Sequence, residues 1–132
     1  CIATDHAPHH IDDKNCEFAK AANGIIGLET AFPLAVTELV EQGYLTPSQL
    51  VEKMSANPAK ILGIKKGQLT PGACADITIA KADEEYTIDV SKMVSKGKNT
   101  PFGGRKVKGK VLYTIVGGNV VVEDGNLVEE AK

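Results

Sequence analysis

The residues best suited to chemistry lie together in Thr4-Asp5-His6-Ala7-Pro8-His9-His10, which holds all three histidines of the chain beside a carboxylate. Carboxylate oxygens and neutral imidazole nitrogens are ordinary zinc ligands. Asp5 and His6 are adjacent on a segment that we expect to be extended, so their side chains should point to opposite faces. A catalytic zinc ion normally has about three protein ligands. We therefore expect a complete zinc site to need ligands from outside this chain, and a His-rich turn without a function stays open as the alternative.

The elements around this segment predict where it lies. Residues 1–4 are an apolar run that predicts the end of a buried strand, with Cys1 as a small buried hydrophobic residue. Polar groups just past the C-terminal end of a strand are where α/β barrels present catalytic residues. Residues 10–23 are polar and predict a long surface loop of the kind that often has a function.

Helices are expected to follow this loop. Apolar residues recur at helical spacing over residues 28–42, Pro33 fits only in the first turn, and Gly43 is a natural residue after the C-terminus. Thr46, Pro47 and Gln49 form the pattern of a capping box and predict the start of a second helix.

A third short helix is predicted from Asn57-Pro58, which repeats the cap-plus-proline signal, to Leu62, and Gly63 should end it. The chain then changes in character, and we expect strands over residues 76–80, 86–90, 111–116 and 120–123. Gly117-Gly118-Asn119 indicates a hairpin between the last two. Residues 92–110 are basic and glycine-rich and predict a solvated loop. We place a domain boundary near residue 66, giving the ranges 1–66 and 67–132.

Composition excludes several classes of function. The chain has 132 residues, 42% of them hydrophobic, and a net charge of −2, which predicts a folded soluble protein. It has no basic stripe for nucleic acid and no apolar run long enough for a membrane. Three widely spaced cysteines favour a reducing, cytoplasmic location. Because the sequence starts without Met, inside an expected strand, we expect a fragment of a longer protein.

The motifs together resemble class I dihydroorotases over essentially the whole chain. Asp5-His6-Ala7-Pro8-His9 is similar to the family motif at the end of the eighth barrel strand and is the most specific part. The remaining similarities lie in Asp13-Lys14, Asn23-Gly24-Ile25-Ile26-Gly27-Leu28-Glu29-Thr30, Asn57-Pro58-Ala59, Gly67 to Asp76, and Asn99-Thr100-Pro101-Phe102-Gly103-Gly104. The resemblance implies an α/β fold: the last strand and helices of a metal-dependent (β/α)8 barrel in residues 1–66, and part of a small β-sandwich in residues 67–132.

The resemblance also implies roles for four residues. Asp5 matches the aspartate that binds one zinc ion and shuttles a proton, so it is both a metal ligand and a catalytic candidate. His9 matches the histidine that contacts the substrate carboxylate. Asn23 and Gly24 match a loop pair that touches the substrate through its backbone. His6 is expected to form hydrogen bonds behind the site, and His10 to be exposed.

The reaction implied is the reversible zinc-dependent closure of N-carbamoyl-L-aspartate to L-dihydroorotate. Two zinc ions would supply hydroxide near neutral pH, and Asp5 would transfer the proton. The remaining metal ligands would lie before Cys1, so the fragment alone should be inactive. As partners, the resemblance implies a homodimer and aspartate transcarbamoylase.

Two other functions stay open. A neighbouring cyclic amidase, such as an allantoinase or hydantoinase, shares the aspartate but need not keep Pro8-His9. A metal-free, non-catalytic scaffold would keep the fold and lose the metal ligands. We also expect exposed apolar surface on the helices and, from it, self-association.

Overall fold

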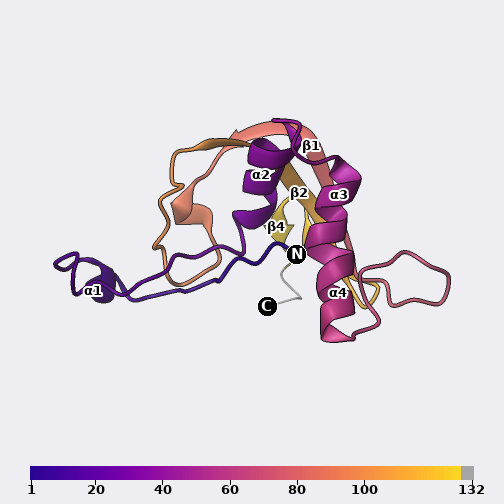
Figure 1. Ribbon diagram of the computed structural model, residues 1–132, viewed down its shortest axis with the longest axis horizontal. Helices are drawn as coiled ribbons and strands as arrows, with labels where there is room; N and C mark the ends of the chain where they lie inside the picture. Colours follow the sequence, from indigo (N-terminus) through magenta and orange to yellow (C-terminus); the bar gives the residue numbers. More distant parts are fainter. Residues whose placement is uncertain (129–132) are drawn as a thin grey trace.

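The computed structural model describes residues 1–128 (Figure 1). Helices come first along the chain, and a four-stranded antiparallel sheet follows with its strands in the order β1-β2-β3-β4. Helix α2 packs against β2. The segment that carries α1 (Ile11–Lys14) extends away from the sheet, as Figure 1 shows. The fold is thus an α/β arrangement with one long segment projecting from it.

The first long helix consists of α2 (Ala31–Ala35), which continues without a break into the π-helical stretch η1 (Val36–Val40). It confirms the main part of the helix predicted over residues 28–42. Pro33 lies in the first turn, where a backbone N–H has no partner within the helix and its loss is harmless. Gly43 follows the helix with a positive φ of 76°, which a side chain would disfavour.

The second long helix is continuous and has three stretches: α3 (Pro47–Val51), the π-helical η2 (Glu52–Ala56) and α4 (Asn57–Leu62). The predicted capping box is confirmed, since Thr46 and Gln49 bond to each other's backbone N–H groups. The prediction that a separate helix begins at Asn57 is wrong. Pro58 has no N–H to donate, and the π-helical turn just before it lets the helix pass through. Gly63, with φ of 66°, ends the helix as predicted.

The sheet consists of β1 (Ile77–Thr87), β2 (Lys106–Val116), β3 (Asn119–Glu123) and β4 (Asn126–Leu127), and a short 3₁₀ turn, η3 (Val90–Lys92), follows β1. Two predictions need correction here. Residues 76–80 and 86–90 are not separate strands, because β1 runs through from 77 to 87 with an irregular register in its middle. Residues 106–110 are not loop, because their backbone pairs with the second half of β1.

Charge pairs explain how such a polar stretch is held in the sheet. Lys110 Nζ lies 2.8 Å from a carboxylate oxygen of Glu84, and Lys106 Nζ lies 3.4 Å from one of Glu85. Cross-strand pairs of opposite charge stabilise neighbouring strands modestly, by about 0.2–1 kcal/mol each. The predicted hairpin between the next two strands is confirmed: Gly117 and Gly118 connect β2 to β3, both with positive φ.

The N-terminal predictions are corrected by the structure. Residues 1–4 form no strand, and Cys1 is exposed rather than buried. A strand needs a neighbour for its backbone groups, and Ile2 N–H instead donates to the Lys53 carbonyl at 3.0 Å, on the second helix. The predicted loop over residues 10–23 contains one helical turn, α1, at whose start the His10 side chain accepts the N–H of Asp12.

The core lies between the two long helices, and the first of them also packs against β2. Ala35, Val36 and Leu50 are buried there together. Gly109 of β2 has φ of 96°, and a Cβ on it would lie 2.9 Å from a methyl carbon of Val36. The residue is therefore required for the helix to approach the sheet so closely.

The expectation of exposed apolar surface is confirmed. On α4, Ile61 and Leu62 are each 70% exposed, and outside the helices Phe18 is 98% exposed and Leu69 79% exposed. Within residues 1–128, no helix combines the length and the hydrophobicity needed to cross a bilayer.

Candidate functional site

Three segments that are distant in the sequence lie side by side at the site: residues 4–9, 22–27 and 97–100. Ala7 N–H donates to the Ile25 carbonyl at 2.9 Å, and Ile26 N–H donates to the Asn99 carbonyl at 3.0 Å. A Cβ built on Gly24 would lie 2.6 Å from the Cβ of Ala7. The glycine therefore permits a contact between the first two segments that no other residue type allows.

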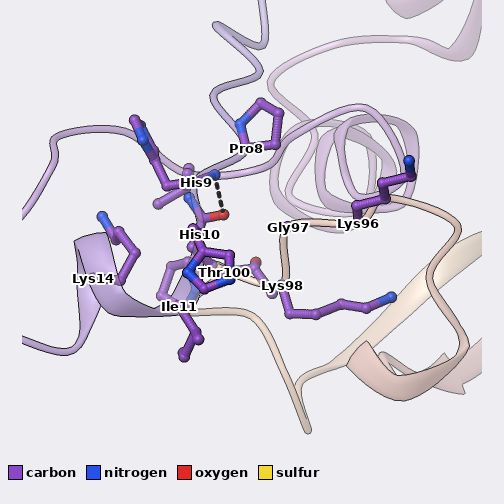
Figure 2. A pocket seen from close by; sticks show the side chains of 12 residues that line it. Pro8, His9, His10, Ile11, Lys14, Lys96, Gly97, Lys98 and Thr100 are labelled. Atoms are coloured by element: carbon purple, nitrogen blue, oxygen red, sulfur yellow. Dashed lines mark hydrogen bonds between the residues drawn. The ribbon is translucent and has the colours of Figure 1, made fainter.

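The side chain of Asn99 joins the three segments. Its Oδ1 accepts the N–H of His9 at 3.1 Å, while its Nδ2 donates to the carbonyls of Ala7 at 2.8 Å and Gly24 at 3.3 Å. Figure 2 draws the bond to the His9 N–H as a dashed line. The amide thus presents a donor and an acceptor to residues 7 and 9 in the way a neighbouring strand would.

His9 and Asn23, two of the predicted substrate contacts, are brought together. The Nε2 atom of His9 lies 2.8 Å from the carbonyl oxygen of Asn23. A carbonyl only accepts, so Nε2 carries the proton and donates it. In the neutral ring, Nδ1 then has no proton and can accept a hydrogen bond from another partner.

The carbonyl of Gly24 is also occupied from within the chain. It accepts from Lys14 Nζ at 3.0 Å and from Asn99, and the same lysine donates to the Ala22 carbonyl at 2.6 Å. Among the residues that the structure describes, the N–H groups of Asn23 and Gly24 donate to no backbone or side-chain group. A ligand at this loop would therefore meet N–H donors rather than free carbonyls.

Asp5 occupies an unusual conformation. Its φ of 46° lies in the left-handed region, so the backbone turns at this residue and the expectation of an extended Asp5-His6 pair is wrong. The residue is exposed, and no hydrogen bond or ion pair to residues 1–128 involves its carboxylate. Such strained residues cluster at functional sites. The carboxylate oxygens are available to an external partner.

The same described residues contain no group of three or more His, Cys, Asp or Glu side chains that could hold an ion together. Asp5 could supply one carboxylate ligand to a metal ion, but residues 1–128 do not contain a complete metal site.

The other two histidines have local roles. The Nδ1 atom of His6 accepts from the N–H groups of Gly27 at 3.0 Å and Leu28 at 3.4 Å, which confirms the predicted hydrogen-bonding role. His10 is exposed as predicted, and its Nδ1 accepts from Asp12 N–H at the start of α1.

A hollow of about 830 Å³ lies beside His9, lined by residues of α1, the 8–11 segment and the 96–101 loop. Figure 2 shows His9, His10 and Lys14 on one side of it. Lys96 and Lys98 line the opposite side, but their side chains extend away from the histidines.

Two residues at the site have no role predicted from the sequence. Asn99 is the first residue of a stretch that resembles a family signature. Its amide contacts residues about 90 positions earlier in the sequence, and the residue types of that stretch do not predict such contacts. Glu29 has the sequence position of a first-turn acid, but its carboxylate accepts the N–H groups of Val94 at 2.9 Å and Ser95 at 3.0 Å. It holds the loop that leads to Asn99.

Comparison with known proteins places this arrangement in a family. The model of the amidohydrolase family matches residues 1–121. A dihydroorotase of Acetivibrio thermocellus is 62% identical over 123 residues, which cover 93% of this chain and 29% of that protein. A dihydroorotase of Geobacter metallireducens is 58% identical over 120 residues, covering 91% of this chain and 28% of that protein. The chain thus spans less than a third of the length of these curated relatives.

Solved structures agree with the family. An L-hydantoinase (dihydropyrimidinase) from Arthrobacter aurescens matches with a TM-score of 0.87 and 39% identity over 94% of this chain and 29% of that one. An inactive dihydroorotase-like domain from Chaetomium thermophilum shares the fold, with a TM-score of 0.61 and 22% identity over 82% of this chain and 28% of that one. The family model covers well over half of the residues, and on that basis the chain belongs to the amidohydrolase family.

Proposed function

We propose that the full-length protein is a dihydroorotase, which interconverts N-carbamoyl-L-aspartate and L-dihydroorotate, and that this chain supplies one side of its active site. The observation that carries the proposal is the identity of 62% to a curated dihydroorotase over 123 of the 132 residues of this chain. The free carboxylate of Asp5 and the Asn99-held backbone of His9 support it.

In ring closure, the terminal ureido nitrogen joins the β-carboxyl carbon, and one carboxyl oxygen leaves as water. The α-carboxylate takes no part and stays on the product ring. A dihydroorotase therefore needs a proton carrier at the reacting carbon and a separate group that recognises the spectator carboxylate. Asp5 and His9 fit these two needs.

Asp5 is proposed as the proton carrier and as a ligand of one of two zinc ions. Zinc supplies, when bound, a water acidic enough to provide hydroxide near neutral pH. In the hydrolytic direction the carboxylate of Asp5 would accept the proton of the attacking water and return it to the departing ring nitrogen. The other zinc ligands would come from parts of the protein outside this chain.

His9 is proposed to bind the spectator carboxylate, with the N–H groups of Asn23 and Gly24 contacting the ring. The bond from His9 Nε2 to the Asn23 carbonyl restrains the imidazole ring and leaves Nδ1 free to contact a ligand. A protonated ring would donate from Nδ1 to the carboxylate while keeping the bond to Asn23, so one imidazole can serve both partners.

The surrounding architecture is part of the proposal. Residues 1–66 would close a (β/α)8 barrel, and residues 67–132 would belong to a β-sandwich. A cytoplasmic homodimer, with aspartate transcarbamoylase as a partner, is the assembly that we propose for the full-length protein.

Substrate preference of the full-length protein tests the proposal. Hydrolysis of dihydroorotate should be much faster than that of dihydrouracil, which has the same ring without the carboxylate, or of hydantoin. The His9→Ala variant should lose most of this preference by a rise in KM for dihydroorotate alone. Preference for dihydrouracil or hydantoin would indicate a different cyclic amidase, and a folded protein that leaves all three intact would indicate a scaffold.

A further inference from the structure

We propose that Asn99 is the residue that positions His9 for substrate binding, with Glu29 holding the loop that carries it. The inference rests on the proposed function in one respect: His9 is taken as the group that binds the substrate carboxylate. Asn99 itself does not touch the substrate in this account.

The backbone around Pro8 has few groups that a neighbour can bind. Pro8 has no N–H, so the backbone between Ala7 and His9 offers only the Ala7 carbonyl and the His9 N–H to a neighbour on that side. The Asn99 amide binds both, at 2.8 Å and 3.1 Å. No strand neighbour pairs with residues 7–9 in the described part of the chain. The amide replaces that neighbour.

Asn99 also binds the segment around Gly24. The same Nδ2 reaches the Gly24 carbonyl at 3.3 Å, and the Asn99 carbonyl accepts the N–H of Ile26 at 3.0 Å. Asn23, whose carbonyl orients the His9 ring, directly precedes Gly24. Asn99 thus fixes both the backbone of His9 and the loop whose carbonyl orients its imidazole.

Glu29 and Gly97 hold the loop that carries Asn99. Both carboxylate oxygens of Glu29 accept N–H groups at the start of the loop, from Val94 and Ser95. Within the loop, a Cβ on Gly97 would lie 2.9 Å from the ring of Pro8 and 3.0 Å from Oδ1 of Asn99. The loop is therefore anchored at its start and packed tightly against the segment that it positions.

Steady-state kinetics of the full-length protein test the inference by a double-mutant cycle. The Asn99→Asp variant keeps an acceptor for the His9 N–H but puts a negative charge against two carbonyls. The two hydrogen bonds that Nδ2 donates, to the carbonyls of Ala7 and Gly24, are lost, so KM for dihydroorotate should rise roughly ten- to hundredfold with a much smaller change in kcat. Asn119→Asp, the same change at an exposed position, is the matched control and should match the wild type.

The cycle separates positioning from a general loss of structure. In a protein that already has His9→Ala, adding Asn99→Asp should raise KM less than about threefold further, because there is no imidazole left to position. Multiplicative effects of the two changes would overturn the inference. Should Asn99→Asp not fold, Asn99→Ser, which keeps a short hydroxyl, enters the same cycle under the same criterion.

Amide exchange followed by mass spectrometry provides a readout that does not depend on the reaction. Peptides that contain the His9 N–H should exchange faster in the Asn99→Asp and Asn99→Ser variants, because both lose the Nδ2 donor that holds the Ala7 and Gly24 carbonyls, while peptides of β2 should be unchanged. A protein without dihydroorotase activity but with this exchange pattern would refute the proposed function and leave the positioning role standing. Unchanged exchange at His9 in both variants would refute the positioning role.

Discussion

Replacing Gly24 by Ala should damage substrate handling far more than it damages the fold. The new Cβ would lie 2.6 Å from the Cβ of Ala7, and ordinary contact begins near 3.4 Å, so the two segments must separate by about 0.8 Å. Ala7 cannot turn aside, since its N–H is bonded to Ile25 and its carbonyl to Asn99. The displacement of Ala7 would therefore also move His9.

The magnitude follows from that displacement. Misplacing a substrate-positioning group by an ångström can lower the rate by roughly a hundredfold, so kcat/KM for dihydroorotate should fall by about that factor. The positive φ of 97° adds a conformational penalty of about 1–2 kcal/mol to the fold. Gly72→Ala is the matched control, because Gly72 has φ of 84° and a Cβ added to it would meet no atom within 4 Å.

The assay is hydrolysis of dihydroorotate by the full-length variants, with thermal denaturation beside it. Both variants bear the cost of the positive φ, Gly24→Ala should be destabilised by about 1–3 kcal/mol more because of its clash with Ala7, and only Gly24→Ala should lose activity. Equal activity of the two variants would show that the close contact between the segments does not position the site.

Two further predictions concern the fold. Gly109→Ala should lower the free energy of unfolding by about 1–3 kcal/mol more than Gly118→Ala in chemical denaturation, because both residues have positive φ but only the first would press a Cβ against Val36; equal effects would contradict the packing argument. The hydrogen bond from Lys66 lowers the pKa of Asp76 to about 2 from an ordinary value of 3.8, so its stabilising effect should be full above 3.8 and disappear as the pH falls toward 2. Asp76→Asn should therefore flatten the stability profile in that window, and an unchanged slope there would show that the pair contributes nothing.

Local signals predicted much of the helical part. The Thr46 capping box and the terminating glycines at 43 and 63 act through neighbouring residues, so the sequence contains all that is needed to identify them. The predicted helix start at Asn57 was wrong because a π-helical turn accommodates Pro58 within a continuous helix. That turn depends on residues 52–56 and not on the Asn57-Pro58 pair.

The sheet was predicted less well for a physical reason. Lys106 and Lys110 look like solvated loop residues by themselves, and only their pairing with Glu85 and Glu84, more than twenty residues earlier, makes them part of a strand. The same limit applies to the site. Resemblance drew attention to His9, but the contact that fixes its backbone comes from a side chain 90 residues away.

Asp5 is proposed to carry the proton and to bind one metal ion in the full-length ring-closing enzyme. The most direct measurement compares turnover of N-carbamoyl-L-aspartate and bound zinc in the full-length protein with Asp5→Asn, using Asp83→Asn on the exposed face of β1 as the matched control. Turnover should be nearly abolished and zinc content reduced in the first variant, while the second should match the wild type. Near-normal turnover in Asp5→Asn would contradict the account.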